Sequence, residues 1–325
     1  MSAQSLFLAS ALSLSLSLAA GAETLTIQVG YGSGGSYDEA ARLIAEHIPR
    51  HLPGTTEVVV ENVPGAGSVK LAKMMMSSTT TDGSQIGTVS SALALLPIFN
   101  PDSTDFDPTK VHYLASMTNS ASYCITPKAS GIDSLDAFLT QEFKVGATGR
   151  DSTTYTYPAA IRAALGARYD IVTGFESATE IDLAMERGEI GARCGIGVTT
   201  LSKGDMLDRY NVIVELAPTP KNELPGVPFL LDRAPDEATR KALELVVSSG
   251  SVHLPFLAPP ATSEEAVARL RAAFDGLAAD PEFAAAAERQ GFELIMTSGV
   301  EVERLIDGFL ASDPAVQEAA RALVQ

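Results

Sequence analysis

The sequence predicts an α/β protein of two domains, each built on a largely parallel sheet. Its 325 residues are more than one compact core usually holds and about the length of two domains. Short β-type runs alternate with helical patterns along the chain, which is typical of βα units. With 46% hydrophobic and 19% charged residues, the composition indicates a full globular core and not a disordered chain.

Residues 1–22 have the features of a secretory signal peptide. Leu6 to Ala20 carry no charge, and Ala20-Gly21-Ala22 fits an A-x-A cleavage site, although Met1 to Ser5 lack the usual Lys or Arg. We therefore expect cleavage after Ala22 and export to the periplasm. No later segment approaches ~18 uninterrupted apolar residues, the length that a membrane-spanning helix needs.

The first domain is predicted to begin with a strand at residues 25–29 and a helix at 37–51, joined by a glycine-rich turn. Next come a strand at 57–61, a helix ending at 76 and a strand at 84–89. Residues 111–126 are extended and lack a helical pattern, which we interpret as the crossing into the second domain.

The second domain repeats the alternation and then returns to the first. Its predicted strands are 144–147, 171–173, 191–195 and 212–216, and its predicted helices are 155–165 and 237–248. The extended residues 252–258 lead back, and helices at 263–279, 281–289 and 300–311 close the first domain. Lobe 1 is thus predicted to be 23–122 plus 252–325 and lobe 2 to be 123–251, with a cleft between them.

The first strand runs into a loop that is suited to binding an anion. Gly34 and Gly35 leave backbone N–H groups unshielded just before a helix, whose dipole favours negative charge. Ser36 and Glu39 fit a capping box, with Ser36 as the N-cap, and Asp38 is spaced to pair with Arg42. A plain strand-to-helix turn would explain the same residues.

A second loop of this kind spans residues 146–155. Ser152 or Thr153 is predicted to be the N-cap of the following helix, and Arg150 can pair with a distal carboxylate of a ligand. Alternatively, Arg150 is a solvated loop cation or a partner of Asp151. Two such loops from different domains predict a clamp on a small anion.

Other kinds of chemistry have weaker support. The absence of Trp and the net charge of −17 disfavour aromatic stacking platforms and nucleic-acid binding. His47 and His51 are separated by Pro49, which favours surface histidines over a metal site. Neither a G-x-S-x-G elbow nor a Walker A lysine is present. We therefore expect a binding protein and not an enzyme, with no metal and no cofactor.

Several motifs together resemble one family. The segment from Val29 to Arg42, the Glu61-Asn62-Val63-Pro64-Gly65-Ala66-Gly67 stretch, and the later Leu224-Pro225-Gly226-Val227-Pro228 and Leu257-Ala258-Pro259-Pro260 segments are similar to Bug-type receptors of tripartite tricarboxylate transporters. The resemblance covers essentially the whole mature chain. It implies a two-lobed periplasmic-binding-protein fold of type II and a monomeric receptor that delivers a small organic acid to membrane components of such a transporter.

The resemblance also implies which residues hold the ligand. Main-chain amides of facing loops hold a carboxylate in that family, and the matching positions here are Gly34, Gly35, Ser36, Ser90, Ser91, Gly149, Asp151, Ser152 and Thr153. Tyr31, Thr148, Arg150 and Phe175 complete the candidate set. Arg150 and the segment from Thr173 to Ser177 depart from the family pattern.

Two cysteines, Cys124 and Cys194, are equally compatible with a disulfide and with two buried thiols when only their spacing is considered. The resemblance implies that their strands are neighbours, which favours the disulfide. Two other functions remain open. A receptor of the same fold can present its ligand to a sensor kinase, and an exported hydrolase would use the serine of the first glycine-rich loop.

Overall fold

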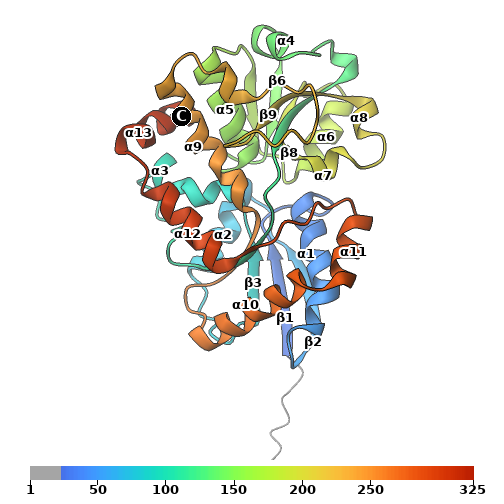
Figure 1. Cartoon of the computed structure of the whole chain (residues 1–325), viewed down its shortest axis with the longest axis vertical. Helices are drawn as coiled ribbons and strands as arrows, with labels where there is room; N and C mark the ends of the chain where they lie inside the picture. Colours follow the sequence, from blue (N-terminus) through green and yellow to red (C-terminus); the bar gives the residue numbers. More distant parts are fainter. Residues whose placement is uncertain (1–22) are drawn as a thin grey trace, which may run out of the picture.

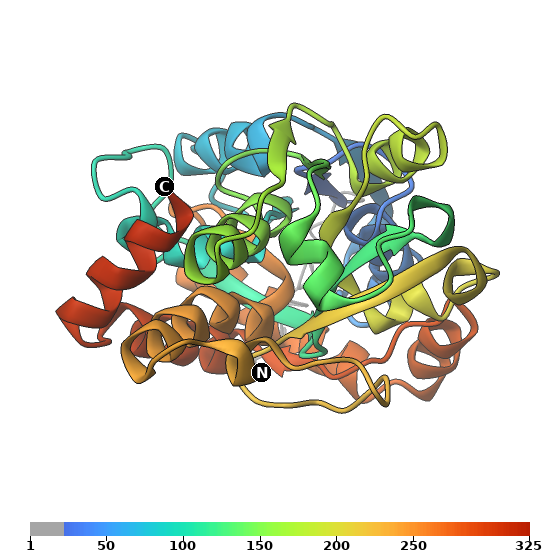
Figure 2. The ribbon, with the colours of Figure 1, turned by 90° about the horizontal axis from the view of Figure 1, so that it is seen from above.

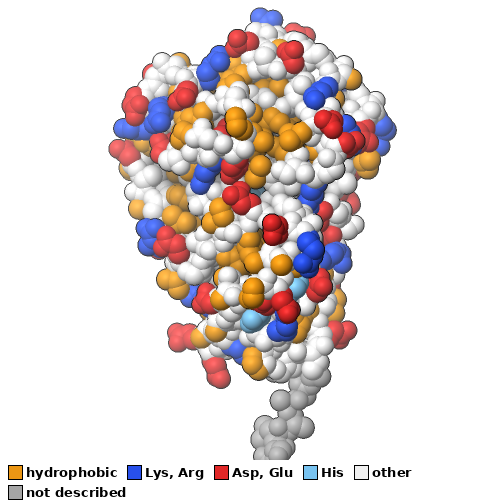
Figure 3. Space-filling model, turned by 45° about the vertical axis from the view of Figure 1, so that its right-hand side comes forward, with side chains coloured by type: hydrophobic (Ala, Val, Ile, Leu, Met, Phe, Trp, Pro, Cys, Tyr) orange, Lys and Arg blue, Asp and Glu red, His pale blue; other side chains and the backbone are white. Residues whose placement is uncertain are grey.

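The computed structural model describes residues 23–325, which form two lobes stacked one above the other (Figure 1). The predicted signal peptide lies outside these residues. None of the described helices is both long and apolar enough to cross a membrane. Acidic and basic side chains are spread over the face in Figure 3, and hydrophobic atoms gather on its upper lobe.

The first lobe is built on a six-stranded mixed sheet. Its strand order is β11-β4-β10-β3-β1-β2, with β1 parallel to β2 and β3, and β10 antiparallel to β3 and β4. The strands are β1 (Glu23–Val29), β2 (Thr55–Asn62), β3 (Gln85–Thr88), β4 (His112–Thr118), β10 (His253–Ala258) and β11 (Thr297–Ser298). The parallel pairing follows the βα pattern of the sequence, and β10 is the returning segment.

Helices cover this sheet because each has one apolar face. They are α1 (Ser36–His47), α2 (Val69–Met76), α10 (Glu264–Ala278), α11 (Pro281–Arg289) and α12 (Gly299–Leu310). Helix α1 is shorter than predicted, because Pro49 turns the chain into a 3-10 segment, Ile48–Arg50. His47 is buried against Phe283, so the prediction that it lies on the surface is wrong.

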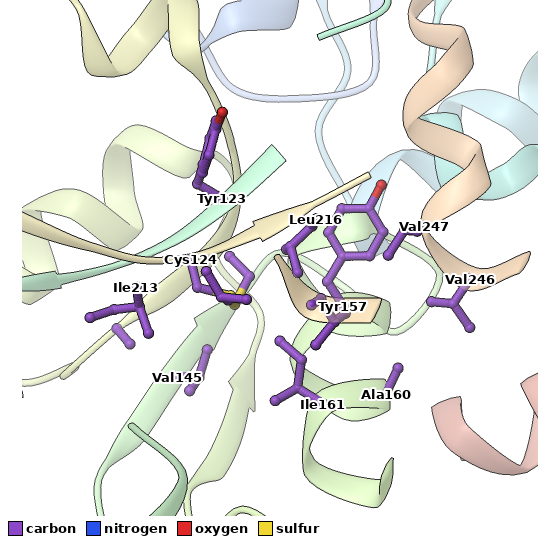
Figure 4. Close-up of a cluster of buried hydrophobic side chains, with 14 of the residues drawn as sticks. Tyr123, Cys124, Val145, Tyr157, Ala160, Ile161, Ile213, Leu216, Val246 and Val247 are labelled. Atoms are coloured by element: carbon purple, nitrogen blue, oxygen red, sulfur yellow. A yellow bond between two sulfur atoms is a disulfide. The ribbon is translucent and has the colours of Figure 1, made fainter. Parts of the chain in front are cut away.

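The second lobe has a three-stranded antiparallel sheet, β8-β5-β9, and a parallel pair, β6-β7. The strands are β5 (Ser122–Pro127), β6 (Lys144–Ala147), β7 (Asp170–Thr173), β8 (Arg193–Gly197) and β9 (Tyr210–Leu216). The helices are α4 (Leu135–Thr140), α5 (Thr153–Leu165), α6 (Ala178–Glu186), α7 (Val198–Leu201), α8 (Met206–Arg209) and α9 (Glu237–Ser248). The short helix α3 (Leu96–Phe99) belongs to the β3–β4 connection of the first lobe, but its Ile98 and Phe99 pack into the core of the second lobe. In its core, Tyr157 of α5 lies among Leu216 and Val247 (Figure 4).

The C-terminal helix α13 (Pro314–Val324) packs on the second lobe, whereas the sequence groups residues 252–325 with the first. It contacts α5 and α9, and it lies beside α9 when the molecule is seen from above (Figure 2). Ala320 and Val324 are buried in the core of the second lobe. The chain therefore connects the lobes at three places: between β4 and β5, between α9 and β10, and between α12 and α13.

Cys124 and Cys194 form a disulfide between the paired strands β5 and β8. Both residues are completely buried. The bridge closes a loop with a sequence separation of 70 residues. By restricting the unfolded chain, such a loop typically stabilises a fold by about 2–4 kcal/mol.

Candidate ligand-binding site

A small cavity lies between the lobes, where β1 of the first lobe and β6 of the second lobe end. Its volume is about 30 Å³, which suits one or two water molecules. The residues that line it are Tyr31, Gly35, Ser36, Tyr37, Thr148, Thr153, Thr154, Ser177, Ala178 and Gly195. None of them is charged, so any anion here must be held by hydrogen bonds and dipoles.

Three helices begin at this cavity. Ser36 is the first residue of α1, Thr153 of α5 and Ala178 of α6, and all three line the cavity. The first N–H groups of a helix have no partner within the helix, and the helix dipole makes its N-terminal end positive. Helix α1 comes from the first lobe, and α5 and α6 come from the second. The arrangement therefore supplies an anion with backbone donors from both lobes.

Two tyrosines form the wall of the cavity on the first lobe. The rings of Tyr31 and Tyr37 are packed together, with 4.7 Å between their centroids. Burial raises the pKa of Tyr31 to about 12, although the hydroxyls of Ser90, Ser68 and Thr148 oppose this shift. Both tyrosines are therefore neutral at pH 7 and offer hydroxyl groups without adding a negative charge.

The first loop is held by Asp38 and Asn62. The carboxylate of Asp38 accepts a hydrogen bond from the Gly34 N–H at 2.9 Å and pairs with Arg42, as predicted. Asn62 donates to Asp38 and to the Tyr31 carbonyl. The Asn of the Glu-Asn-x-Pro-Gly-Ala-Gly stretch thus fixes the loop, and the Gly34 N–H is not free for a ligand.

The predicted capping box at Ser36 is wrong. Gly35 is the N-cap of α1 and Ser36 is its first residue, so the Ser36 side chain does not cap the helix. Glu39 instead pairs with Lys203 of the second lobe, with 2.6 Å between Nζ and Oε2. For the Glu39 carboxylate, the Lys203 ammonium of the other lobe is thus a stronger partner than the nearby backbone N–H that a capping box would offer.

The second loop is held by a network of buried hydroxyls. The hydroxyl of Thr154 accepts a hydrogen bond from the Thr148 N–H at 2.9 Å and contacts the Ser152 hydroxyl at 2.7 Å. Ser152 is completely buried and donates to the Gly149 carbonyl. Ser152 is the N-cap of α5, one of the two residues predicted for this position, but its side chain accepts no capping hydrogen bond from a backbone N–H of the helix.

The lobes touch at Gly149. A Cβ atom on Gly149 would lie only 2.4 Å from the carbonyl carbon of Ala66, so this position requires glycine in the closed form. Ala66, Gly67 and Ser68 all have positive φ, which is strained for Ala and Ser. The Pro-Gly-Ala-Gly stretch is therefore bent so that its backbone meets that of the second loop.

Three more contacts join the lobes around the cavity. The Gly32 N–H donates to the Glu176 carbonyl at 3.0 Å, and the Thr179 hydroxyl donates to the Gly34 carbonyl at 2.9 Å. The third contact is the Glu39–Lys203 pair described above. In this closed arrangement the cavity between the lobes, at about 30 Å³, is too small for an organic acid of several carbon atoms.

The predicted ligand residues occupy several different environments. Tyr31, Gly35, Ser36, Thr148 and Thr153 line the cavity, whereas Ser90 and Ser91 lie behind it. The N–H groups of Ser90 and Ser91 donate to the hydroxyl oxygens of Ser68 and Tyr37. Phe175 packs on the core of the second lobe. Asp151 is partly buried, which raises the pKa of its carboxyl although Arg150 opposes this shift.

Arg150 is not among the residues that line the cavity. Its guanidinium lies over the Tyr155 ring, 5.4 Å from the centroid, and the residue is exposed. Of the alternatives left open by the sequence, this position corresponds most closely to a solvated loop cation.

Five lining residues were not predicted from the sequence: Tyr37, Thr154, Ser177, Ala178 and Gly195. Ser177 caps α6 by accepting a hydrogen bond from the Glu180 N–H at 3.2 Å. The Ser-x-x-Glu pattern at residues 177–180 is a helix-start signal that could have revealed this third N-terminus. Gly195 lies in β8 and lines the cavity because β8 pairs with β5, and no local sequence pattern predicts that position.

The site lacks the parts of a nucleophilic hydrolase. A reactive serine needs a base that a third group orients. His253 is near Ser36 because both line a neighbouring cavity, but its buried Nδ1 has no hydrogen-bond partner among the described residues. Burial also lowers the pKa of His253 to about 4, which makes it a weak base. No cluster of three potential metal ligands occurs in residues 23–325.

Comparisons with known proteins agree with this geometry. A sequence model described as the tripartite tricarboxylate transporter family receptor matches residues 40–152. A Cupriavidus necator protein described as "UPF0065 protein in gbd 5'region" is 32% identical over 111 residues, which are 34% of this chain and 32% of that protein. The match thus spans about a third of the length of that curated relative.

Two solved structures from Rhodopseudomonas palustris share the fold. MatC with bound malate has a TM-score of 0.70 at 18% identity and covers 93% of this chain and 99% of its own. A second protein, with adipate, has a TM-score of 0.71 at 15% identity, with 91% and 97% covered. The matched sequence in residues 40–152 and the shared two-lobed fold together confirm the resemblance of this chain to the receptors of tripartite tricarboxylate transporters.

Proposed function

We propose that this protein is a periplasmic receptor that captures a small carboxylate between its lobes and delivers it to a tripartite tricarboxylate-type transporter in the membrane. The ligand is a di- or tricarboxylate or a related organic acid, and it is bound without being chemically changed. The receptor acts as a monomer. The proposal draws on the family match in residues 40–152 and on two structural relatives, one with bound malate and one with adipate.

One observation carries the proposal. The N-termini of α1, α5 and α6 converge on one cavity that contains no charged side chain. Each helix N-terminus favours an anion by only about 0.3–1 kcal/mol, so several backbone hydrogen bonds must add to the affinity. The chain carries a net charge of −17, and local donors therefore have to outweigh an unfavourable distant field.

The proposed location is supported by the disulfide. Disulfides persist in oxidising compartments such as the periplasm, and Cys124 and Cys194 are paired here. The predicted signal peptide at residues 1–22 is consistent with export.

The experiment is a thermal-shift screen of the purified mature chain with malate, succinate, citrate and adipate, using neutral sugars as controls. A ligand at a hundred times its Kd stabilises the native state by about 2.7 kcal/mol, so the melting temperature should rise clearly with at least one acid. Stabilisation by a sugar, with none by any acid, would contradict the proposal.

A matched variant connects the shift to the cavity. Ala178→Pro removes one backbone N–H at the first position of α6, where proline fits a helix. The stabilisation by the acid should decrease while the melting temperature without ligand changes little. An unchanged stabilisation would remove α6 from the site.

A further inference from the structure

A second cavity lies on the other side of Ser36. Its volume is about 20 Å³, and its walls include Ser36, Ser120, Thr199 and His253. Ser36 lines both cavities, so the two cavities lie on either side of the first residue of α1.

The imidazole of His253 is available for hydrogen bonding. Its Nδ1 atom is buried and lacks a partner among the described residues, which is an uncommon condition for a buried polar atom. The ring meets Tyr37 edge-on, with 5.6 Å between centroids. Burial lowers the pKa of His253 to about 4, so the ring is neutral at pH 7 and does not attract a second carboxylate.

Two carboxylates lie directly behind the wall of this second cavity. The Ser120 hydroxyl donates to Glu293 at 3.2 Å, and the Ala121 N–H donates to Glu223, also at 3.2 Å. Burial and the charge of Glu293 raise the pKa of Glu223, although its bonds to Ala121 and Tyr123 oppose this shift. Because the Ser120 proton is committed to Glu293, its oxygen is left to accept a hydrogen bond from a ligand.

We infer that the cavity beside His253 is a subsite for a hydrogen-bond donor without negative charge. The ligand then carries one carboxylate, held at the three helix N-termini, and a distal hydroxyl, amide or ammonium group in this subsite. A second carboxylate would be desolvated near Glu293, and no Lys or Arg is among the residues that line this cavity. This inference rests on the proposed function and narrows its ligand class.

The experiment compares acids that differ only at the distal end. Titration calorimetry would measure Kd for malonate, succinate and glutarate, for their monoamides, for the corresponding ω-hydroxy and ω-amino acids, and for the monocarboxylates that end in methyl. A donor-terminated acid should bind at least ~10-fold more tightly than the dicarboxylate of the same length, as expected for one good hydrogen bond and an avoided unpaired charge.

Three variants at two positions test the residues of this subsite. His253→Leu should weaken the donor-terminated acid about 5- to 10-fold and leave the methyl-terminated acid unchanged, whereas His253→Gln should restore part of the difference. Glu293→Gln should improve dicarboxylate binding several-fold, because it removes a repelling charge. The ratio of the Kd values of two acids that differ only at the distal end reports recognition in this subsite, because a general loss of stability would weaken both acids equally.

A dicarboxylate that binds as tightly as its monoamide, or a His253→Leu variant that weakens all acids equally, would overturn the inference and leave the proposed function in place. Failure of every acid in this series would also overturn it. The separate screen with malate, citrate and adipate would then decide the proposed function independently.

Discussion

The two loops that meet at the cavity are held in place by different means. The loop at residues 31–36 belongs to the first lobe and is fixed by ionised and amide groups, Asp38 and Asn62, at the start of α1. The loop at residues 148–152 belongs to the second lobe and is fixed by buried neutral hydroxyls of Thr148, Ser152 and Thr154.

The difference shows which groups are free for a ligand. In both loops, residue types that suit anion binding are partly used to hold the loop itself, as with the Gly34 N–H and the Ser152 hydroxyl. The first loop depends on charge and should respond to pH and salt. The second depends on buried hydrogen bonds and should respond to the loss of a single hydroxyl.

The largest expected effect is at the point where the second loop touches the first lobe. Gly149→Ala places a Cβ atom against Ala66 and should hinder closure of the lobes. Overpacking of this kind costs about 1–3 kcal/mol, which corresponds to a roughly 5- to 150-fold weaker Kd. Calorimetric titration with the acid found by the screen measures this change.

The matched control is Gly308→Ala in α12, where a Cβ atom would meet nothing within 4 Å. It should leave Kd unchanged. If Gly149→Ala binds as tightly as the control, closure does not depend on this contact.

The next effect tests the hydroxyl network. Thr154→Val leaves the Thr148 N–H without its acceptor and should lower the free energy of unfolding by about 1–3 kcal/mol. Thr156→Val is the control two residues further along the same helix, because the Thr156 hydroxyl is buried without a partner. Urea denaturation should show the control to be neutral or stabilised, and equal losses in both variants would contradict the network.

The charged loop should differ in its dependence on pH. Burial raises the pKa of Asp38, but its bonds with Arg42, the Gly34 N–H and Asn62 outweigh this and lower the pKa below 3.8. The stabilisation is thus present above the ordinary carboxyl pKa and is lost as the pH falls through the lowered one. Denaturation between pH 7 and pH 3 should show that Asp38→Asn loses less stability on acidification than the wild type, and an identical dependence would contradict this role.

The smallest effect concerns the Glu39–Lys203 pair between the lobes. Both side chains are about one-third exposed, so the pair contributes only about 0.2–1 kcal/mol and is screened by salt. Lys203→Met should weaken ligand binding by at most a few-fold at low salt and less at high salt. A loss that is independent of salt would indicate that the contact of Lys203 with the Phe292 ring matters more than its charge.

Much of the fold could be predicted because local patterns and packing agree. Helix α9 has the predicted bounds, and β6 matches residues 144–147. The predicted crossing at residues 111–126 contains β4 and β5, which belong to different sheets. Helix α13 was missed although Asp313 and Pro314 mark its start, and its place on the second lobe depends on contacts that no local pattern encodes.

The site was predicted in outline and not in detail. Glycine and hydroxyl residues after two strands correctly marked two of the helix N-termini that line the cavity. The hydroxyls of Ser68 and Tyr37 accept hydrogen bonds from the Ser90 and Ser91 amides, and these pairings depend on tertiary contacts. The placement of the Arg150 guanidinium over the Tyr155 ring is likewise not marked by a local pattern. Such competition between internal partners and a ligand is invisible in a single sequence.

The most direct measurement of the shared anion site is the change in amide NMR shifts when the acid found by the screen is added. The account predicts that the backbone amides of Ser36, Thr153 and Ala178, which come from both lobes, change together along one binding curve. Changes confined to one lobe, or absent from all three helix starts, would contradict it.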